Sequence, residues 1–258
     1  MLTFKNTNIV FLLLLAICLM LHVEIIKIPF WIYLILILFY SLIVFYGCIN
    51  IQSGFFIPVV CSAKISEKVI AISFDDGPVA EDTLKILQIL SEHEIEAAFF
   101  CIGSRVKGNE NILRQMVSEG HIIGNHSYSH HFFFDLFSSK KMLQELKSTD
   151  KEIQAAAGFT PAFFRPPYGV TNPIIKKVII KGNYIPIGWT VRSMDTAIKD
   201  EKKLFKKITE QIHPGAIYLF HDTSKTTQAT LPLFIDFVKE NGYKIIRLDK
   251  MLHLNSYA

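Results

Sequence analysis

The stretch that decides the fold is Val69-Ile70-Ala71-Ile72-Ser73-Phe74-Asp75-Asp76-Gly77-Pro78. Its first half is almost wholly apolar, which is typical of a short strand with both faces covered, as in a parallel sheet. Gly77-Pro78 then breaks the chain, and a helical pattern follows. The sequence therefore predicts two adjacent carboxylates, Asp75 and Asp76, on a turn at the carboxyl end of a buried strand. In α/β folds, side chains at such strand ends line the functional cleft.

The two carboxylates raise a question of charge. Neighbouring side chains of a strand point to opposite faces, and two carboxylates held at one site repel each other unless a cation or a shared proton compensates. Asp-Gly and Gly-Pro are also ordinary turn dipeptides, so the pair alone fits a simple turn as well as a functional site. The partners that the rest of the chain supplies decide between the two interpretations.

Strand and helix patterns alternate through the chain. The expected strands are 69–73, 97–101, 121–124, 162–165, 184–189, 216–220 and 244–248, and the expected helices are 80–93, 110–119, 139–157, 172–182, 200–212 and 230–241. Strands joined through helices pair in parallel by right-handed crossovers. The fold class is therefore α/β, either a parallel barrel or a doubly wound sheet. We favour the barrel because polar residues follow nearly every strand rather than one switch point.

The amino-terminal region has a different composition. The chain of 258 residues is 50% hydrophobic and 19% charged, more apolar than an average soluble domain, and the excess lies in two runs, 9–21 and 30–48. Because about 20 apolar residues span a bilayer, the second run is long enough and the first is marginal. A cleaved signal peptide is the alternative for the first run, but no small-x-small site follows it and a second apolar run does. We expect a two-span membrane anchor at 1–50, a linker at 51–66 and a catalytic domain at 67–258, with residues 9–48 in contact with lipid.

Charge and motif patterns argue against two classes of partner. The net charge is only +4, and the lysine pairs fall on predicted helices, where they form solvated faces. No basic stripe is interleaved with aromatic residues, and no Gly-rich phosphate loop follows a strand, so we expect neither nucleic acid nor nucleotide as a partner. The four cysteines do not form a disulfide framework.

Polar residues gather after the predicted strands. His126 and His130 follow the third strand, and if they share a helical turn their Cβ atoms lie about 5–6 Å apart on one side. Two imidazoles and one carboxylate with open positions are typical of a catalytic metal site, since structural zinc sites close their shell with four protein ligands. One Asp of the pair can then ligate the metal, while the other stays free to take a proton from water.

Three more polar residues complete the predicted rim of the barrel. Arg165 follows the fourth strand and can pair with the free carboxylate, which lowers the pKa of that group. His221 follows the sixth strand as a candidate general acid, and Asp195 is a candidate to orient its imidazolium. Each of these residues alone fits an ordinary ion pair or a satisfied core histidine. Together at one rim they favour catalysis.

Four motifs in order resemble those of polysaccharide deacetylases with a NodB homology domain, carbohydrate esterase family four, over about 69–252: Ser73-Phe-Asp-Asp-Gly-Pro78, His126-Ser-Tyr-Ser-His130, Arg165-Pro-Pro-Tyr-Gly169 and Leu219-Phe-His221. The resemblance implies a distorted seven-stranded (β/α)7 barrel and a divalent metal, usually zinc, with cobalt or nickel as alternatives. It also implies roles for individual residues: Asp75 as base, His221 as acid, Arg165 and Asp195 as their partners, Asp76, His126 and His130 as metal ligands, and Pro167, Tyr168 and Leu219 at the substrate, where the Tyr168 N–H would bind the oxyanion.

One motif departs from the family pattern. The family often has Asp-Trp where this chain has Asp195-Thr196, so the residue that tunes the acid is kept but the aromatic wall of the pocket is not. Trp189 is a candidate substitute in the substrate pocket. Arg192 adds a positive charge where an acidic residue is common. The reaction is therefore expected to be that of the family, and the identity of the substrate is open.

The sequence hypothesis is a membrane-anchored bacterial enzyme that hydrolyses N-acetyl groups on amino sugars of a glycan, such as peptidoglycan, a chitooligosaccharide or a lipid-linked sugar. Its expected place is the cytoplasmic membrane, with the catalytic domain outside the cytoplasm, as the resemblance implies. Two alternatives stay open: the same chemistry on a non-sugar amide, and an anchored carbohydrate-binding or scaffold domain with a decayed site.

Overall fold

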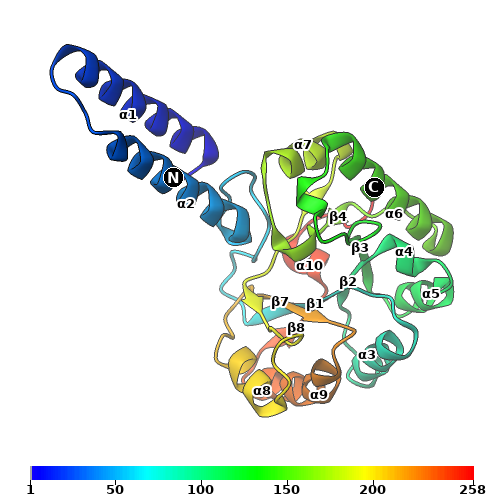
Figure 1. The fold of residues 1–258 in the computed structure, drawn as a ribbon. Coiled ribbons are helices and arrows are strands. Elements are labelled where there is room, and N and C mark those ends of the chain that lie inside the picture. Colours follow the sequence, from blue (N-terminus) through cyan, green and yellow to red (C-terminus); the bar gives the residue numbers. More distant parts are fainter. Residues whose placement is uncertain (1) are drawn as a thin grey trace.

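The computed structural model describes residues 2–258 and has two parts, a helical hairpin and an α/β barrel (Figure 1). The hairpin consists of α1 (Phe4–Glu24) and α2 (Phe30–Ile49). Both helices are long and apolar enough to cross a membrane, and most of their large apolar side chains are exposed. Length and composition alone do not separate a membrane span from a signal sequence, so the membrane anchor stays a proposal.

The barrel is built on parallel strands, as predicted. The strands are β1 (Val69–Asp75), β2 (Ala98–Cys101), β3 (Ile122–Asn125), β4 (Phe163–Phe164), β5 (Ile185–Pro186), β6 (Val191–Arg192), β7 (Ile217–His221) and β8 (Lys244–Ile245). Seven of them follow the order β5-β4-β3-β2-β1-β7-β6, and β8 pairs with the first residues of β1. Because β5 and β6 are the two ends of this path, the barrel is open between them. The predicted (β/α)7 class is confirmed.

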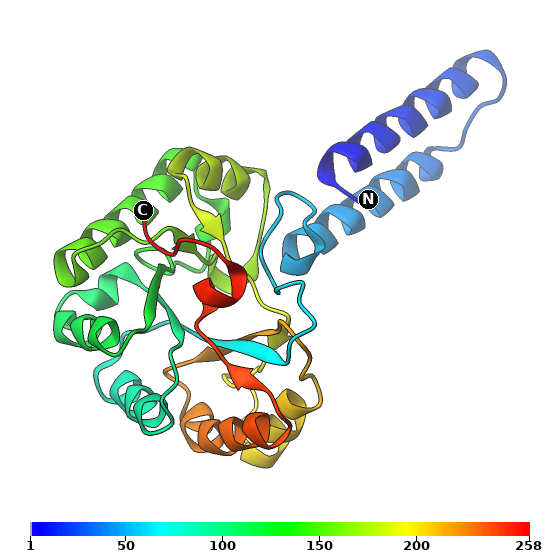
Figure 2. The ribbon, with the colours of Figure 1, turned by 180° about the vertical axis from the view of Figure 1, so that it is seen from behind.

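Helices surround the strands (Figure 1). They are α3 (Ala80–Glu92), α4 (Gly103–Val106), α5 (Glu110–Ser118), α6 (Ser139–Ala157), α7 (Pro173–Gly182), α8 (Glu201–Thr209), α9 (Lys225–Glu240) and α10 (Leu248–Leu252), with short 3-10 turns η1 (Ile51–Ser53), η2 (Phe134–Leu136) and η3 (Pro167–Gly169). Figure 2, from behind, shows the red α10 across the barrel. There Leu248 and Met251 join the inner core with Val69.

Three predicted boundaries are wrong. The expected strand 184–189 is only the two residues of β5, because the chain leaves the sheet after Pro186, and β6 at Val191–Arg192 is a further strand that the sequence did not predict. The expected helix 230–241 begins earlier, at Lys225, because the Ser224 side chain accepts a hydrogen bond from the Thr227 N–H and caps it. The last strand ends at Ile245 rather than at residue 248, since the chain turns there into α10.

Successive side chains of β1 point alternately into two hydrophobic cores. All seven residues are buried. Ile70, Ile72 and Phe74 pack outward in the core beneath the helices, whereas Val69 and Ala71 face the interior of the barrel. Strand alternation therefore places Ser73 and Asp75 on the interior face as well. Asp75, the predicted catalytic carboxylate, therefore points into the barrel because it occupies the same alternating positions of β1 as Val69 and Ala71.

The segment 51–66 packs against the open seam of the barrel. Ile51 belongs to the inner core, Val60 forms a parallel bridge with Ile187, and Ser62 forms an antiparallel bridge with Ala216. Ile187 comes just after β5, one free end of the strand path, and Ala216 comes just before β7, which pairs with the other free end, β6. The division of the chain into anchor, linker and catalytic domain stays a prediction, but residues 51–66 also cover part of the core.

Replacing Gly215 tests how tightly this segment is packed. Gly215 has a φ of +74°, and a Cβ there would lie 2.1 Å from the Ala63 carbonyl oxygen. Gly215→Ala should therefore lower the free energy of unfolding by roughly 2–5 kcal/mol, the sum of left-handed backbone strain and overpacking. Gly108→Ala is the matched control, because φ is +86° with nothing within 4 Å of its Cβ, and it should cost only about 1–2 kcal/mol. Equal losses in urea denaturation would contradict the packing of residues 62–63 on the barrel.

Candidate active site and metal centre

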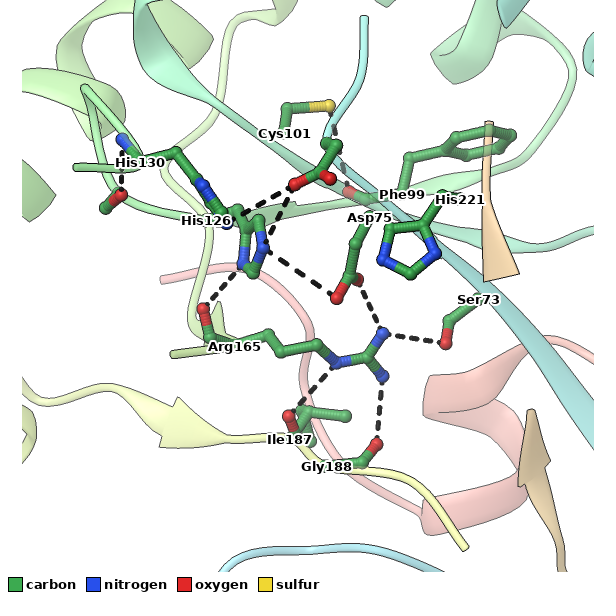
Figure 3. Close-up of polar contacts among 12 residues, drawn as sticks. Ser73, Asp75, Phe99, Cys101, His126, His130, Arg165, Ile187, Gly188 and His221 are labelled. Atoms are coloured by element: carbon green, nitrogen blue, oxygen red, sulfur yellow. Dashed lines mark hydrogen bonds and ion pairs between the residues drawn. The ribbon is translucent and has the colours of Figure 1, made fainter. Parts of the chain in front are cut away.

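A buried ion pair stands at the centre of the site (Figure 3). Arg165 Nη1 donates to Asp75 Oδ1 at 2.7 Å and to Ser73 Oγ at 2.9 Å. Its Nε and Nη2 donate to the carbonyl oxygens of Ile187 and Gly188 at 3.2 and 2.9 Å. The Arg165 side chain is fully buried and Asp75 is 4% exposed. Arg165 therefore fixes one oxygen of Asp75, and Oδ2 of the carboxylate turns toward the histidines.

Asp76 meets two imidazoles beside this pair. Its Oδ1 lies 3.5 Å from His126 Nε2 and 3.4 Å from His130 Nε2, and one ligand atom from each of the three residues lies within 4.8 Å of the others. Asp75 Oδ2 is 3.8 Å from His126 Nε2. The structure thus brings together the three predicted metal ligands, and Figure 3 shows two of them, His126 and His130, beside Asp75.

The two histidines converge by a route that the sequence analysis did not foresee. The two residues do not share a helical turn, because residues 126–131 are irregular. Ser127 and His130 have positive φ angles of 64° and 46°, and the turn is held by bonds from the Ser127 N–H to Asn125 Oδ1 and from the His130 N–H to Ser127 Oγ. The ring centroids of His126 and His130 are 4.9 Å apart.

The donor set fits a divalent metal. Asp76 Oδ1 is buried and has no hydrogen-bond partner, which is costly unless a cation occupies the site. His126 Nδ1 lies 2.8 Å from the Arg165 carbonyl oxygen, so it donates there and its Nε2 lone pair faces Asp76. Burial and the neighbouring His126 lower the pKa of His130 to about 4, so its imidazole is neutral and free to ligate near pH 7.

A second carboxylate holds His221 at the end of β7. Asp195 Oδ1 accepts from His221 Nδ1 at 2.7 Å, and Oδ2 accepts from the His221 backbone N–H at 2.7 Å and from the Thr227 hydroxyl. Burial lowers the pKa of His221, but the hydrogen bond and charge of Asp195, with the charges of Asp75 and Asp76, raise it above its ordinary value. His221 is thus oriented and favoured in its protonated form, as an acid requires.

Backbone strain is concentrated in these motifs. Of the eight described non-glycine residues with positive φ, five lie in or beside the site: Asp76, Ser127, His130, Tyr168 and Met194. Each such conformation costs about 1–3 kcal/mol and persists where the surroundings impose it. At Asp76, which follows β1 directly, the positive φ interrupts the alternation of the strand.

A cleft of about 160 Å³ opens over the ligand groups. Trp189, Leu219 and Thr196 form part of its wall with Arg192, and Tyr168 and Gly169 form another part. Tyr168 is 45% exposed, and its ring lies 4.7 Å from that of His130. The predicted substrate residues Trp189, Leu219 and Tyr168 therefore line the cleft, whereas Pro167 is buried in η3 and does not line it. Their roles toward a substrate stay predictions.

Asp222 directly follows His221 in the chain and is a fully buried carboxyl. Its Oδ2 accepts from the Thr83 hydroxyl, and its Oδ1 has no partner. A Cβ on Gly77 would lie 2.1 Å from Asp222 Oδ2, so this carboxyl packs directly under the Asp75–Pro78 turn. Burial, opposed by the Thr83 hydrogen bond and reinforced by the charge of Asp76, raises the pKa of Asp222 to about 7. Its proximity to Gly77 depends on tertiary packing, which no local pattern reveals.

An open parallel barrel with one carboxylate, two histidines and a separate buried acid–base pair at its rim defines a class of α/β proteins with a candidate mononuclear hydrolytic metal centre. The chain belongs to the polysaccharide deacetylase family. The model of that family matches residues 62–185, which include the first three of the four motifs.

Individual relatives are consistent with this assignment. The chain is 33% identical over 190 residues to the peptidoglycan-N-acetylmuramic acid deacetylase PdaA of Bacillus subtilis, covering 72% of each chain. It is 32% identical over 195 residues to the peptidoglycan-N-acetylglucosamine deacetylase PgdA of Listeria monocytogenes, covering 76% of this chain but only 41% of that protein. The crystal structure of the peptidoglycan N-acetylglucosamine deacetylase Bc1960 superposes with a TM-score of 0.73 at 27% identity, covering 78% of this chain and 95% of that one.

The ligand assignment predicts a loss of metal on substitution. His126→Ala should reduce the zinc bound by the purified chain from about one equivalent to near zero, because two ligands do not hold the ion. His131→Ala is the matched control, since His131 is exposed and its Nδ1 accepts from the Phe133 N–H. Metal content by mass spectrometry after dialysis against zinc measures both. Full zinc content in the His126→Ala variant would refute the site.

Proposed function

We propose that the chain is a metal-dependent deacetylase that hydrolyses the N-acetyl group of an amino sugar in a glycan. The proposal rests on the different surroundings of the two adjacent carboxylates, Asp75 and Asp76. Asp75 is bound to Arg165 through Oδ1 and turns Oδ2 toward the histidines, whereas Asp76 Oδ1 lies between the two imidazoles. One carboxylate is placed to accept a proton and the other to hold a cation.

Asp76, His126 and His130 would hold the metal, for which zinc suits two imidazoles and a carboxylate, with cobalt or nickel as alternatives. When bound there, the ion would act as a Lewis acid that polarises the acetyl carbonyl and acidifies water. The neutral state of His130 and the orientation of His126 keep both Nε2 atoms available for this purpose.

Asp75 acts as the general base. Its Oδ2 takes the proton from the water that attacks the acetyl carbonyl carbon, while the hydrogen bond from Arg165 to Oδ1 stops the carboxylate from rotating. The Tyr168 N–H donates to the oxygen that becomes negative in the tetrahedral state. Leu219 and Trp189 line the cleft, where they would enclose the acetyl methyl group and exclude bulk water.

His221 acts as the general acid. Its Nδ1 is held by Asp195, so the other ring nitrogen, Nε2, is free to deliver a proton to the amine nitrogen as the carbon–nitrogen bond breaks. The products are acetate and a free amino sugar. Asp195 acts through His221, by fixing the ring and by favouring the imidazolium.

The relatives named above indicate an envelope glycan, and peptidoglycan is the first candidate substrate. We further propose that α1 and α2 anchor the chain in the cytoplasmic membrane, with the barrel outside the cytoplasm. A reporter fused after residue 258 tests this sidedness. If a fused reporter that works only in the cytoplasm is active, the proposed sidedness is overturned, but the proposed chemistry is not affected.

Removing the base should abolish turnover. Asp75→Asn keeps the shape of the side chain but takes away its basicity, so kcat for acetate release should fall roughly 10²- to 10⁴-fold, while zinc content stays unchanged because Asp76 and both histidines remain. The assay compares peptidoglycan, a chitooligosaccharide and a simple N-alkyl acetamide with the full chain.

Two outcomes of this assay would overturn the proposal. A zinc-loaded chain that binds glycan but releases no acetate would favour a carbohydrate-binding domain. Release of acetate from the simple amide alone would favour an amidohydrolase of non-sugar substrates.

The acid should set the alkaline limit of the pH–rate profile. His221 must be protonated to act, and Asp195 raises its pKa, so the rate is maintained until the pH passes that raised value. Asp195→Asn removes the negative charge, lowers the pKa of His221 and should move the alkaline limb to lower pH, with a lower maximal kcat. Profiles of kcat against pH for both chains measure the shift. An unchanged limb would mean that His221 is not the titrating acid.

A further inference from the structure

The outward face of α7 carries only lysines and apolar residues. The exposed residues of this helix are Pro173, Lys176, Lys177, Ile180 and Lys181, whose spacing of three and four places them on one side. Ile180 is 65% exposed, unusual for a large apolar side chain in the middle of a charged stripe. The opposite side, with Ile175, Val178 and Ile179, packs in the core.

This face continues into the start of the hairpin. A hollow of about 320 Å³ is lined by Lys5 and its neighbours in α1 together with Pro173 and Lys176 of α7. A groove of about 440 Å³ runs between α6 and α7 and is lined by Lys140, Lys147, Lys177 and Lys181. Among the described residues that line the two hollows there is no carboxylate, although Lys147 also pairs with Asp150. We call Lys5 together with these residues of α6 and α7 the basic face.

The basic face lies where the hairpin meets the barrel. Figures 1 and 2 show α7 beside the near end of the hairpin, whereas α8 and α9 lie across the barrel from α7. The contact is fixed by hydrogen bonds: the Phe4 N–H donates to the Phe55 carbonyl, and the Thr171 N–H and hydroxyl donate to the carbonyls of Cys48 and Gly47 at 3.0 and 3.2 Å. Thr171 lies two residues before Pro173, so the start of α7 is tied to the end of α2.

We propose that the basic face rests on the phosphate groups of the bilayer that the hairpin spans, as a binding surface for anionic phospholipid. This inference rests on the membrane insertion of α1 and α2, and not on the deacetylase chemistry. A surface with cationic head groups on flexible stems and an exposed Ile suits the headgroup region, where ammonium groups meet phosphates and the apolar side chain enters the acyl boundary. Lysines alone would favour any polyanion, but their continuity with the hairpin brings them to lipid first.

This contact would orient the active site. Tyr168 at the cleft and Pro173 at the start of α7 are separated by one short loop that also holds the Thr171 bonds to α2. With α7 seated on the headgroups, the barrel has one fixed side toward the membrane, and its cleft faces glycan close to the bilayer surface.

Lysine acylation of the full chain tests the proposal. The chain is placed in nanodiscs of phosphatidylcholine alone or with phosphatidylglycerol, treated briefly with an acylating ester and analysed by mass spectrometry. Labelling of Lys176, Lys177 and Lys181 should fall about threefold or more in the anionic discs and recover near 1 M salt, where the screening length is only about 3 Å. Lys202, Lys203 and Lys206 of α8 are exposed and serve as internal controls.

Two matched triple variants, one in α7 and one in α8, test whether the α7 lysines make the lipid contact. Lys176→Gln/Lys177→Gln/Lys181→Gln should remove the protection of Lys5 and Lys140 in anionic discs, whereas Lys202→Gln/Lys203→Gln/Lys206→Gln should leave it unchanged. Equal labelling of α7 and α8 lysines in both kinds of disc would overturn the lipid contact and leave the anchor standing. Failure of the chain to enter discs would overturn both. Neither result bears on acetate release, which is measured separately in detergent.

Discussion

The site depends on one constraint, the burial of the Arg165 guanidinium inside the barrel. An unpaired buried charge costs several kcal/mol, and here every guanidinium nitrogen has a partner: Nε and Nη2 bind the carbonyls of Ile187 and Gly188, and Nη1 binds Ser73 and Asp75. These partners lie on β1 and just after β5, so one side chain from the end of β4 ties distant strands together. The carbonyl of the same residue orients His126. The proposed base, Asp75, and one proposed metal ligand, His126, are thus positioned by a single residue.

Backbone geometry explains how the adjacent residues Asp75 and Asp76 can both direct their carboxylates to one site. Strand parity sends Asp75 into the barrel along with Ser73, where the arginine receives it. Asp76 would then point to the opposite, outer side. Its φ of 76° breaks the alternation and turns its carboxylate back toward the histidines. Two neighbouring carboxylates can therefore serve one site in different roles, one paired with a fixed cation and the other left with a buried oxygen that has no partner.

The sequence was informative wherever the pattern is local. Apolar runs and breaks at Gly and Pro predicted the parallel barrel, and polar residues after the strands predicted which side chains meet. The spacing of His126 and His130 led to the right pair through the wrong geometry, because a turn with positive φ brings the rings as close as a helix would. Asp222 under Gly77 and the packing of residues 51–66 could not be predicted, since both are contacts between segments far apart in the chain.

The hairpin packs against the loop that leads from the site to α7, so the amino-terminal region contacts the barrel directly. Gly47 approaches Phe55 so closely that a Cβ would lie 2.1 Å from its ring, and the carbonyls of Gly47 and Cys48 hold Thr171. Thr171 follows the strained turn at Tyr168, whose N–H is the proposed oxyanion donor. A flexible linker would let the barrel take any orientation. Here close packing and hydrogen bonds join α2 to the loop of the site, so the hairpin and the cleft have a defined direction relative to each other.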